Sequence, residues 1–406
     1  MNATSGPPTQ AVILAGGRGT RMRPLTDDRP KPMVEFHGRP FLEYLIEMLG
    51  EQGIERVELL LGYLPQVVQD HFGDGSRLGV DISYSVSGAD DLTVSRLRLV
   101  QERLDPCFLL LYCDNYWPMD MERMWERFRA LDVPAMVTVY ANRDGHRAGK
   151  DSVLVDGDGY LRVFDKSRRT SGLQGVEISY AILDRDVLDL LPEEDAMFEI
   201  ALYPQLAARG RLAAYVTDHR YYSVGSLERL AATERFLGRR PAVILDRDGT
   251  LNYRPPKAQY VTSPEQFDWL PGSLEALALL GEHGYTVAVV SNQAGIGRGA
   301  MTEGDLVAIH ARMIAEARDA GCEIDAIYHC PHDWDEGCEC RKPAPGMLFE
   351  AQRELDLDLS RTPFLGDDER DGQAAEAAGC PFVMVGQEHS LLDGVRGLVA
   401  ERAVAA

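Results

Sequence analysis

Two aspartates in the second half of the chain have the spacing of a phosphoryl-transfer site. Asp246 and Asp248 lie two residues apart in DRDGTLN (246–252), directly after the apolar run 241–245. One carboxylate can attack phosphorus and form an aspartyl-phosphate. The other can protonate the leaving oxygen and then activate water. An isolated Asp-x-Asp pair is weak evidence because acidic loops are common, so the residues that accompany it decide the interpretation.

Further polar residues follow other apolar runs. Two carboxylates repel a phosphate unless Mg²⁺ bridges them, so a third carboxylate is expected nearby. GDDERD (366–371) supplies Asp367 and Asp371. Donors for phosphate oxygens and a cation complete the set: Ser291, Asn292, Gln293 and Lys342. This ordered set is far more specific than any of its members.

The set resembles the haloacid dehalogenase phosphatases over about residues 241–390. The resemblance implies that Asp246 is the nucleophile and Asp248 the general acid and base. It also implies that Ser291 and Lys342 bind the phosphoryl group and that Arg341 contacts substrate. The Mg²⁺ ligands it implies are Asp246, the Asp248 backbone carbonyl and Asp367. A degraded phosphatase fold is the alternative, but no core residue of the set is missing.

A cluster of sulfur and nitrogen ligands lies just before Arg341 in CPHDWDEGCEC (330–340). It holds three thiols and one imidazole, enough for a closed tetrahedral zinc site with no position left for water. The four ligands are Cys330, His332, Cys338 and Cys340. We therefore expect a structural zinc that fixes the loop carrying Arg341 and Lys342. Free reduced cysteines beside a chance histidine are the alternative.

The cluster narrows the resemblance to two phosphatase subgroups. Together with SNQAGIGRG (291–299) and CRKPAPGM (340–347), it resembles heptose 1,7-bisphosphate phosphatases and histidinol-phosphate phosphatases. Tyr260-Val261 and the glycine run within 291–299 favour the heptose enzymes. The short gap between His332 and Cys338 occurs in the histidinol-phosphate type, so both substrates stay open.

The first half of the chain opens with a loop that can cradle phosphates. AVILAGGRGTRMRPLT (11–26) is an apolar run followed by glycines whose backbone N–H groups can approach an anion. It lacks the ending of a P-loop and the spacing of a dinucleotide-binding loop. The loop's glycines, its threonine and the cations around it form the candidate anion site: Gly16, Gly17, Gly19, Thr20, Arg21 and Lys31.

This loop with RPKPM (29–33) resembles the sugar-1-phosphate nucleotidyltransferases over about residues 10–237. The resemblance implies that the glycine loop wraps a nucleoside triphosphate while Arg21 and Lys31 neutralise charge at the α-phosphorus. Mg²⁺ bound by Asp114, a sugar-phosphate contact from Lys166 and a sugar-hydroxyl acceptor at Glu199 are also implied.

Three departures from that family pattern are visible. Ser223 stands where a second Mg²⁺-binding Asp is usual, 90–97 replaces a glycine-rich base-binding loop, and Tyr112-Cys113-Asp114 replaces Asn-Gly-Asp. One alternative for this half is therefore a degenerate module that binds a sugar nucleotide or promotes oligomerisation.

Alternating apolar runs and helical spacing must position these residues. The predicted fold class is α/β, with two Rossmann-like three-layer α/β/α domains in tandem, nucleotidyltransferase-like and then haloacid dehalogenase-like. We expect a flexible leader over 1–9 and domains over 10–238 and 241–406, the second carrying the zinc knuckle. Strands separated by helices predict parallel pairing. The expected strands are 11–15, 56–61, 107–112, 135–140, 241–246, 286–291, 325–329, 363–367 and 382–386, with helices over 41–52 and 119–130.

Composition limits the partners. The 406 residues carry a net charge of -22, which disfavours nucleic acid and anionic membranes as partners. No signal peptide or membrane span is visible, and the cysteine usage favours the cytoplasm.

We expect a bifunctional enzyme that removes the 7-phosphate from heptose 1,7-bisphosphate and transfers a nucleotidyl group, with GTP as the suggested donor, to the remaining 1-phosphate. Its partners would be phosphosugars and nucleoside triphosphates, its cofactors Mg²⁺ in both domains and Zn²⁺ in the second; a homo-oligomer is compatible with the sequence. The alternative is a histidinol-phosphate phosphatase fused to the degenerate module.

Overall fold

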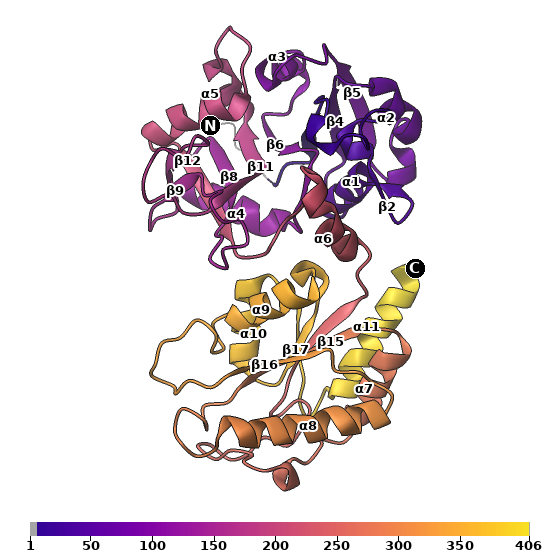
Figure 1. Ribbon diagram of the computed structural model, residues 1–406, viewed down its shortest axis with the longest axis vertical. Coiled ribbons are helices and arrows are strands. Elements are labelled where there is room, and N and C mark those ends of the chain that lie inside the picture. The colour runs from indigo at the N-terminus through magenta and orange to yellow at the C-terminus, as the bar shows by residue number, and fades with distance from the viewer. Residues whose placement is uncertain (1–5, 406) are drawn as a thin grey trace. The chain divides into compact units, whose positions relative to one another are not determined.

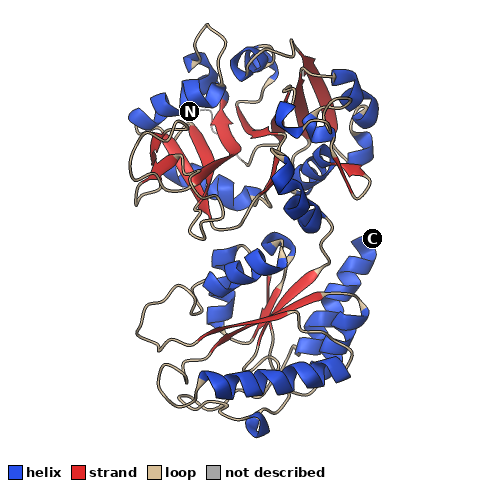
Figure 2. Ribbon diagram, viewed as in Figure 1, coloured by secondary structure: helices blue, strands red, loops and turns tan. Residues whose placement is uncertain are grey.

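The computed structural model describes residues 6–405 and divides into two compact units, Met1–Gly238 and Arg239–Ala406. In each unit a central sheet lies between helices (Figures 1 and 2). Of the expected leader, residues 1–5 lie outside the described residues. Thr9 already joins the fold, because its carbonyl accepts hydrogen bonds from the backbone N–H groups of Glu55 and Arg56 at 2.8 and 3.1 Å.

The main sheet of the first unit has the strand order β12-β8-β11-β6-β1-β4-β5. Its strands are β1 (Gln10–Ala15), β4 (Arg56–Leu61), β5 (Asp81–Val86), β6 (Cys107–Tyr112), β8 (Ala135–Tyr140), β11 (Val176–Asp184) and β12 (Leu212–Thr217). Strands β5, β4, β1 and β6 pair in parallel, and so do β8 and β12. The glycine loop follows β1, and Asp114 follows the neighbouring β6.

The expectation of parallel pairing throughout is wrong at one strand of this sheet. β11 pairs antiparallel with both β6 and β8. The chain between β8 and β11 holds a small antiparallel ribbon, β9 (Val153–Val155) and β10 (Leu161–Phe164), and no helix. Parallel neighbours need a long crossover, usually a helix, whereas an antiparallel strand can return without one.

Helices cover both faces of the first sheet, which makes three layers. Alternate residues of β1 show this, because Ile13 belongs to one apolar core and Leu14 to the other. The helices are α1 (Phe41–Glu51), α2 (Pro65–Phe72), α3 (Thr93–Arg98), α4 (Met121–Leu131), α5 (Phe198–Ala208) and α6 (Leu227–Leu237). The first core includes residues of α1, α2, α4 and α6, and the second core includes residues of α3 and α5.

Two further short ribbons complete this unit: β2 (Glu35–Phe36) with β3 (Arg39–Pro40), and β7 (Asn115–Tyr116) with β13 (Tyr222–Ser223). The second ribbon pairs Ser223 with Asn115. It therefore brings Ser223 next to Asp114, although the two are far apart in sequence.

The second unit has a sheet of parallel strands in the order β16-β15-β14-β17-β18. Its strands are β14 (Ala242–Asp246), β15 (Thr286–Asn292), β16 (Ala326–Cys330), β17 (Phe364–Gly366) and β18 (Phe382–Met384). Its helices are α7 (Ser273–Glu282), α8 (Glu303–Asp319), α9 (Gly346–Leu355), α10 (Glu369–Ala378) and α11 (Leu391–Ala405). Residues of α7, α8 and α11 share one core, and residues of α9 and α10 share the other.

The carboxyl ends of four of these strands carry the candidate phosphatase and zinc residues. Asp246 ends β14, Ser291 and Asn292 end β15, Cys330 ends β16, and Asp367 follows β17. Open parallel sheets bind ligands at this edge. Within residues 6–405, no helix has the length and apolar character needed to cross a membrane.

Candidate active sites

A buried lysine joins two aspartates in the second unit. Lys342 Nζ lies 2.6 Å from Asp246 Oδ1 and 2.7 Å from Asp371 Oδ1, and donates to the Val290 carbonyl at 3.1 Å. All three charged side chains are buried. Burial, together with Asp371, raises the pKa of Asp246 to about 7 although Lys342 opposes the shift. The predicted nucleophile and phosphate-binding cation are thus in direct contact.

Three carboxylates beside this lysine could hold a divalent cation. One oxygen each of Asp246, Asp367 and Asp371 lies within 4.8 Å of the others. Mg²⁺ prefers carboxylate oxygens, so the residues fit this ion. Asp371 joins the predicted ligands Asp246 and Asp367 here. The Asp248 carbonyl, the third predicted ligand, accepts a hydrogen bond from Arg254 Nε at 3.2 Å.

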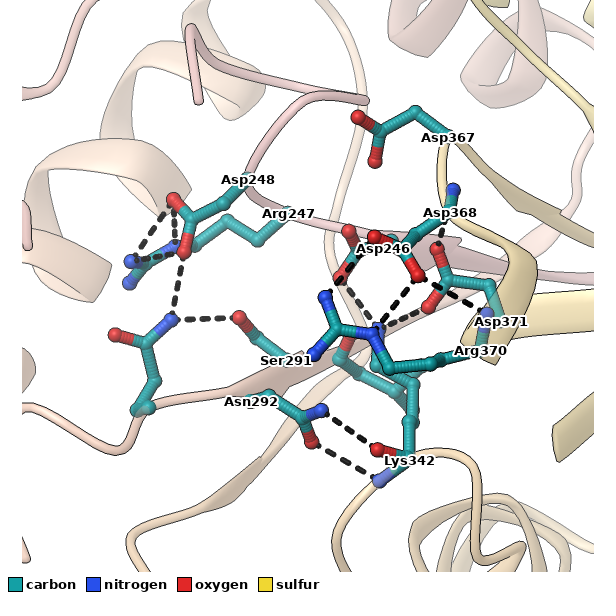
Figure 3. A network of polar contacts seen from close by, with 12 residues as sticks. Asp246, Arg247, Asp248, Ser291, Asn292, Lys342, Asp367, Asp368, Arg370 and Asp371 are labelled. Carbon is teal, nitrogen blue, oxygen red and sulfur yellow. Dashed lines mark hydrogen bonds and ion pairs between the residues drawn. The ribbon is translucent and has the colours of Figure 1, made fainter. Parts of the chain in front are cut away.

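The Asp248 side chain points away from Asp246 (Figure 3). Its carboxylate is held by three donors: Arg247 at 2.9 Å, Asn252 at 3.0 Å and Gln293 at 2.9 Å. Burial alone would raise the pKa of Asp248, but Arg247 and the two amides hold it below its ordinary value. In this arrangement Asp248 is ionised, as a base that accepts a proton from water must be.

Two of the three residues that hold Asp248, Arg247 and Asn252, did not emerge from the sequence as site residues, whereas Gln293 was expected as a donor to phosphate oxygens. Arg247 is fully buried although it lies between the two aspartates. Gln293 also donates to Ser291 Oγ at 2.7 Å and so links the predicted phosphate ligand to the predicted acid. For Arg247 and Asn252, the position directly beside the motif residues was the only available signal.

The loop that carries Arg341 and Lys342 is fastened to β15. Asn292 Nδ2 donates to the Lys342 carbonyl, and the Lys342 backbone N–H donates to Asn292 Oδ1, each at 3.0 Å. Asn292, expected to bind substrate, therefore also fixes this loop. Arg341 lines the same cavity of about 610 Å³ as Asp246, Asp248 and Ser291, and its buried Nη1 has no hydrogen-bond partner among the described residues. That nitrogen is available to a bound anion.

Gly249, in the DRDGT motif, has to be glycine. Its φ of +104° lies in the region that favours glycine, and a Cβ there would be 1.9 Å from Asp367 Oδ2. The close approach lets the loop after β14 and the carboxylate after β17 share one site.

The predicted zinc ligands lie together. Cys330 Sγ is 3.5 Å from His332 Nδ1 and 3.6 Å from Cys338 Sγ, and Cys340 Sγ is 3.2 Å from His332 Nδ1 and 3.5 Å from Cys338 Sγ. With Zn–S near 2.3 Å and Zn–N near 2.0 Å, a tetrahedral zinc places its ligand atoms about 3.5–3.8 Å apart. The four residues fit zinc, and within residues 6–405 no disulfide joins any of the cysteines.

The site of the first unit is a cavity of about 600 Å³ at the carboxyl ends of β1 and β6. Lys31 Nζ lies 2.7 Å from Asp114 Oδ2. Burial alone would raise the pKa of Asp114, but Lys31 holds it below its ordinary value. Asp114 could supply one carboxylate ligand to Mg²⁺. The other ligands of the ion would then be phosphate oxygens of the bound nucleotide.

A second lysine faces a second acidic group across this cavity. Lys166 Nζ lies 3.0 Å from Glu199 Oε1 and 3.6 Å from Glu177 Oε2. Tyr112 Oη donates to Glu199 Oε2 at 2.6 Å. Glu177 and Tyr112 were not expected site residues. The cavity thus offers one lysine–carboxylate pair beside the glycine loop and another beside Tyr112.

Of the predicted anion-binding loop, the cavity wall includes Gly16, Gly17, Arg21 and Lys31. Among the described residues, Gly19 and Thr20 are not part of that wall. Thr20 is exposed and begins a 3₁₀ turn, Thr20–Met22.

Arg96 is a structural centre of this site that the sequence did not reveal. The buried guanidinium donates to the carbonyls of Leu61, Gly88 and Asp91 at 2.6–3.0 Å and to Ser87 Oγ at 2.8 Å. A Cβ on Gly16 would lie 2.2 Å from this guanidinium. Gly16 is therefore required by Arg96, and the unusual 90–97 segment is fastened to the glycine loop.

Ser223 offers no second carboxylate. It is buried, and its Oγ accepts the backbone N–H of Gly225 at 3.1 Å. The backbone N–H of the next residue, Val224, donates to the Asp114 carbonyl at 3.0 Å. The serine thus occupies the position beside Asp114 as a backbone-supporting residue, and Arg229 lines the cavity on the same side.

Comparison with known proteins agrees with the two sites. Residues 10–150 match the family model described as Nucleotidyl transferase, and residues 339–396 match the model described as HAD-hydrolase-like. The D-glycero-beta-D-manno-heptose-1,7-bisphosphate 7-phosphatase of Bordetella bronchiseptica is 45% identical over 138 residues, which are 34% of this chain and 76% of that protein.

Two solved structures are also similar. The D,D-heptose 1,7-bisphosphate phosphatase from B. bronchiseptica, complexed with magnesium and phosphate, is 38% identical with a TM-score of 0.38 and covers 40% of this chain and 99% of that one. HddC from Yersinia pseudotuberculosis, complexed with GMP-PN, is 26% identical with a TM-score of 0.48 and covers 56% of this chain and 99% of that one.

The fold and site of the second unit define a phosphatase of the haloacid dehalogenase class, preceded in the same chain by a nucleotidyltransferase domain. More narrowly, the chain belongs to the D-glycero-β-D-manno-heptose-1,7-bisphosphate 7-phosphatase family.

Proposed function

We propose that the chain catalyses two consecutive reactions on one sugar. The second unit would remove the 7-phosphate of D-glycero-D-manno-heptose 1,7-bisphosphate, the substrate that the names of its relatives state. The first unit would then join the remaining 1-phosphate to a nucleoside triphosphate, with GTP as the suggested donor, and release pyrophosphate. The contact between Lys342 and Asp246 at 2.6 Å supports the hydrolytic step most directly, because the proposed nucleophile and the proposed phosphate-binding cation are neighbours.

In the hydrolysis, Asp246 attacks phosphorus and the bond to the sugar oxygen breaks. Asp248 first takes up a proton from solvent, gives it to that oxygen and later accepts one from the water that releases phosphate. This requires the Asp248 carboxyl to turn from Arg247 toward Asp246. Ser291, Lys342 and Arg341 bind the phosphoryl oxygens. When bound at Asp246, Asp367 and the Asp248 carbonyl, Mg²⁺ would offset the repulsion between carboxylate and phosphate.

In the nucleotidyl transfer, the sugar phosphate attacks the α-phosphorus and pyrophosphate leaves. Lys31 and Arg21 neutralise charge on the triphosphate, while Lys166 and Glu199 hold the sugar phosphate and its hydroxyls. Asp114 would bind Mg²⁺ together with the phosphates. A structural zinc at the four-ligand cluster would fix the loop of Arg341. We place the enzyme in the cytoplasm, because three of its cysteines are grouped with His332 as candidate metal ligands instead of forming disulfides.

A second candidate for the first unit is a module that binds a sugar nucleotide without turnover. The observation that favours it is Ser223, whose hydroxyl is a poor Mg²⁺ ligand and is already used by Gly225.

Two matched variants separate these functions. Asp246→Asn should abolish phosphate release from the bisphosphate and leave pyrophosphate release from heptose 1-phosphate unchanged, and Asp114→Asn should do the reverse. Phosphate release that survives Asp246→Asn would refute the assigned nucleophile. Phosphate release from histidinol phosphate but not from the heptose bisphosphate would refute the substrate.

A further inference from the structure

Arg254, on the segment after the DRDGT motif, reaches the groups proposed to bind Mg²⁺. Its Nη2 donates to Asp367 Oδ1 at 2.8 Å, and its Nε donates to the Asp248 carbonyl at 3.2 Å. Its Nη1 donates to Asp368 Oδ2 at 2.9 Å. One guanidinium therefore contacts two of the three predicted Mg²⁺ ligand groups and one neighbouring carboxylate.

Two other cations of the site, Lys342 and Arg247, form ion pairs with other carboxylates. Lys342 is bonded to Asp246 and Asp371, and Arg247 to Asp248. Arg254 is the residue that balances Asp367, since its Nη2 makes the ion pair to that carboxylate. A divalent cation bound to the same oxygens would lie next to the guanidinium, and the two charges would repel each other strongly at that distance.

The Arg254 side chain also has room to move away from the proposed metal ligands. Its side chain is 42% exposed, it lines the cavity, and its segment, 253–259, forms neither helix nor strand. Asp368, which accepts Nη1, lies outside the three proposed metal ligands. The guanidinium can leave Asp367 and the Asp248 carbonyl while it keeps its bond to Asp368.

We propose that Arg254 is a positioning residue that keeps the cation site assembled in the metal-free protein and that Mg²⁺ must displace. The proposal rests on the Mg²⁺ site of the proposed function. Asp368 serves as the anchor that retains the displaced guanidinium at the cavity wall.

The test is a calorimetric titration of the full-length, metal-free protein with Mg²⁺ in the absence of substrate. Arg254→Ala should lower the Kd for Mg²⁺ about tenfold, because the competing cation is gone. Arg370→Ala is the matched control, since Arg370 also pairs with Asp368, at 2.8 Å, but contacts neither Asp367 nor the Asp248 carbonyl. It should change the Kd less than twofold.

Thermal unfolding gives a second readout. Arg254→Ala should lower the melting temperature in buffer without Mg²⁺ but not in saturating Mg²⁺, where the ion holds the carboxylates. If the alanine variant does not fold, Arg254→Lys replaces it. This variant keeps the positive charge but loses the several N–H donors of the guanidinium, so it should show a smaller tightening of Mg²⁺ binding.

An Arg254→Ala protein with unchanged or weaker Mg²⁺ affinity would overturn the proposal, as would an equal tightening in Arg370→Ala. Because these titrations contain no substrate, they are independent of which phosphate ester the enzyme hydrolyses. A failed heptose assay with a confirmed Kd shift would therefore refute the proposed substrate alone.

Discussion

At the scale of residues, the phosphatase site is a set of charges in which each buried carboxylate is paired with a cation. Lys342 serves Asp246 and Asp371, and Arg247 serves Asp248. Buried ions need such partners, because an unpaired buried charge costs several kcal/mol. The site is thus held in place before substrate arrives, which is how preorganised electrostatic catalysis works.

A histidine behind Asp248 makes the stability of the second unit depend on pH. His310 lies on α8 with Nε2 3.3 Å from Arg247 Nη1, and His329 and Asp248 also face it. Burial, Arg247 and His329 lower the pKa of His310 to about 3 from 6.5. The folded unit therefore keeps this imidazole neutral while the unfolded chain protonates it.

We expect the free energy of unfolding to fall as the pH drops below 6.5 toward 3, by at most about 1.4 kcal/mol per pH unit from this group. Denaturant unfolding of His310→Gln between pH 7 and 4.5 should show a smaller slope than the wild-type protein. His283→Gln, a change at an exposed histidine of the same unit, is the control. Equal slopes in the wild-type protein and His310→Gln would contradict the assignment.

At the scale of elements, both sites are built where loops follow parallel strands. In the second unit the zinc cluster starts at the end of β16 and leads directly into Arg341 and Lys342. Gly297 N donates to the Pro331 carbonyl at 2.8 Å, so the loop after β15 is packed on the cluster as well. We therefore expect the cluster to position two predicted site residues, Arg341 and Lys342.

Loss of one zinc ligand should disturb this arrangement at a distance from the chemistry. We expect Cys338→Ser to reduce the bound zinc from about one per chain to near zero, because three ligands bind far more weakly than four. The variant should also lose phosphate release, since Arg341 and Lys342 lose their support. Zinc is measured by mass spectrometry of the purified protein.

The matched control is Cys322→Ser, which alters a buried cysteine outside the cluster. It should retain both zinc and activity. A Cys338→Ser protein that keeps full phosphate release without zinc would show that the knuckle does not position Arg341 and Lys342.

The strands and their polar ends could be predicted because apolar runs and motif spacing are local signals. β4, β6 and β8 have the predicted bounds, and β14 begins one residue later than expected. Arg96, Arg247 and Arg254 could not be predicted as site residues, because only the folded chain shows which carbonyls and carboxylates surround a buried guanidinium. The antiparallel β11 was missed for a similar reason, since its direction depends on the connection after β8.

At the scale of the whole molecule, the charge is divided unequally. Residues 1–240 contain 29 basic and 36 acidic residues, and residues 241–406 contain 13 and 28. An acidic chain that acts on anions needs local cations. In both units these are lysines and arginines at the carboxyl edge of a sheet, where strand-end loops converge.

The pairing of the two units on one chain has a chemical logic. Hydrolysis at one end of a sugar bisphosphate leaves a sugar 1-phosphate, which is the nucleophile that a nucleotidyltransferase needs. The central claim is therefore that one polypeptide carries the bisphosphate through to a nucleotide-activated sugar.

The most direct test incubates the purified full-length chain with heptose 1,7-bisphosphate, Mg²⁺ and each nucleoside triphosphate in turn, and follows the sugar by phosphorus NMR. We predict loss of the 7-phosphate signal, followed with one preferred triphosphate by pyrophosphate and a nucleotide-linked sugar. In Asp114→Asn the reaction should stop at heptose 1-phosphate. Wild-type protein that accumulates heptose 1-phosphate with every triphosphate and releases no pyrophosphate would contradict the account.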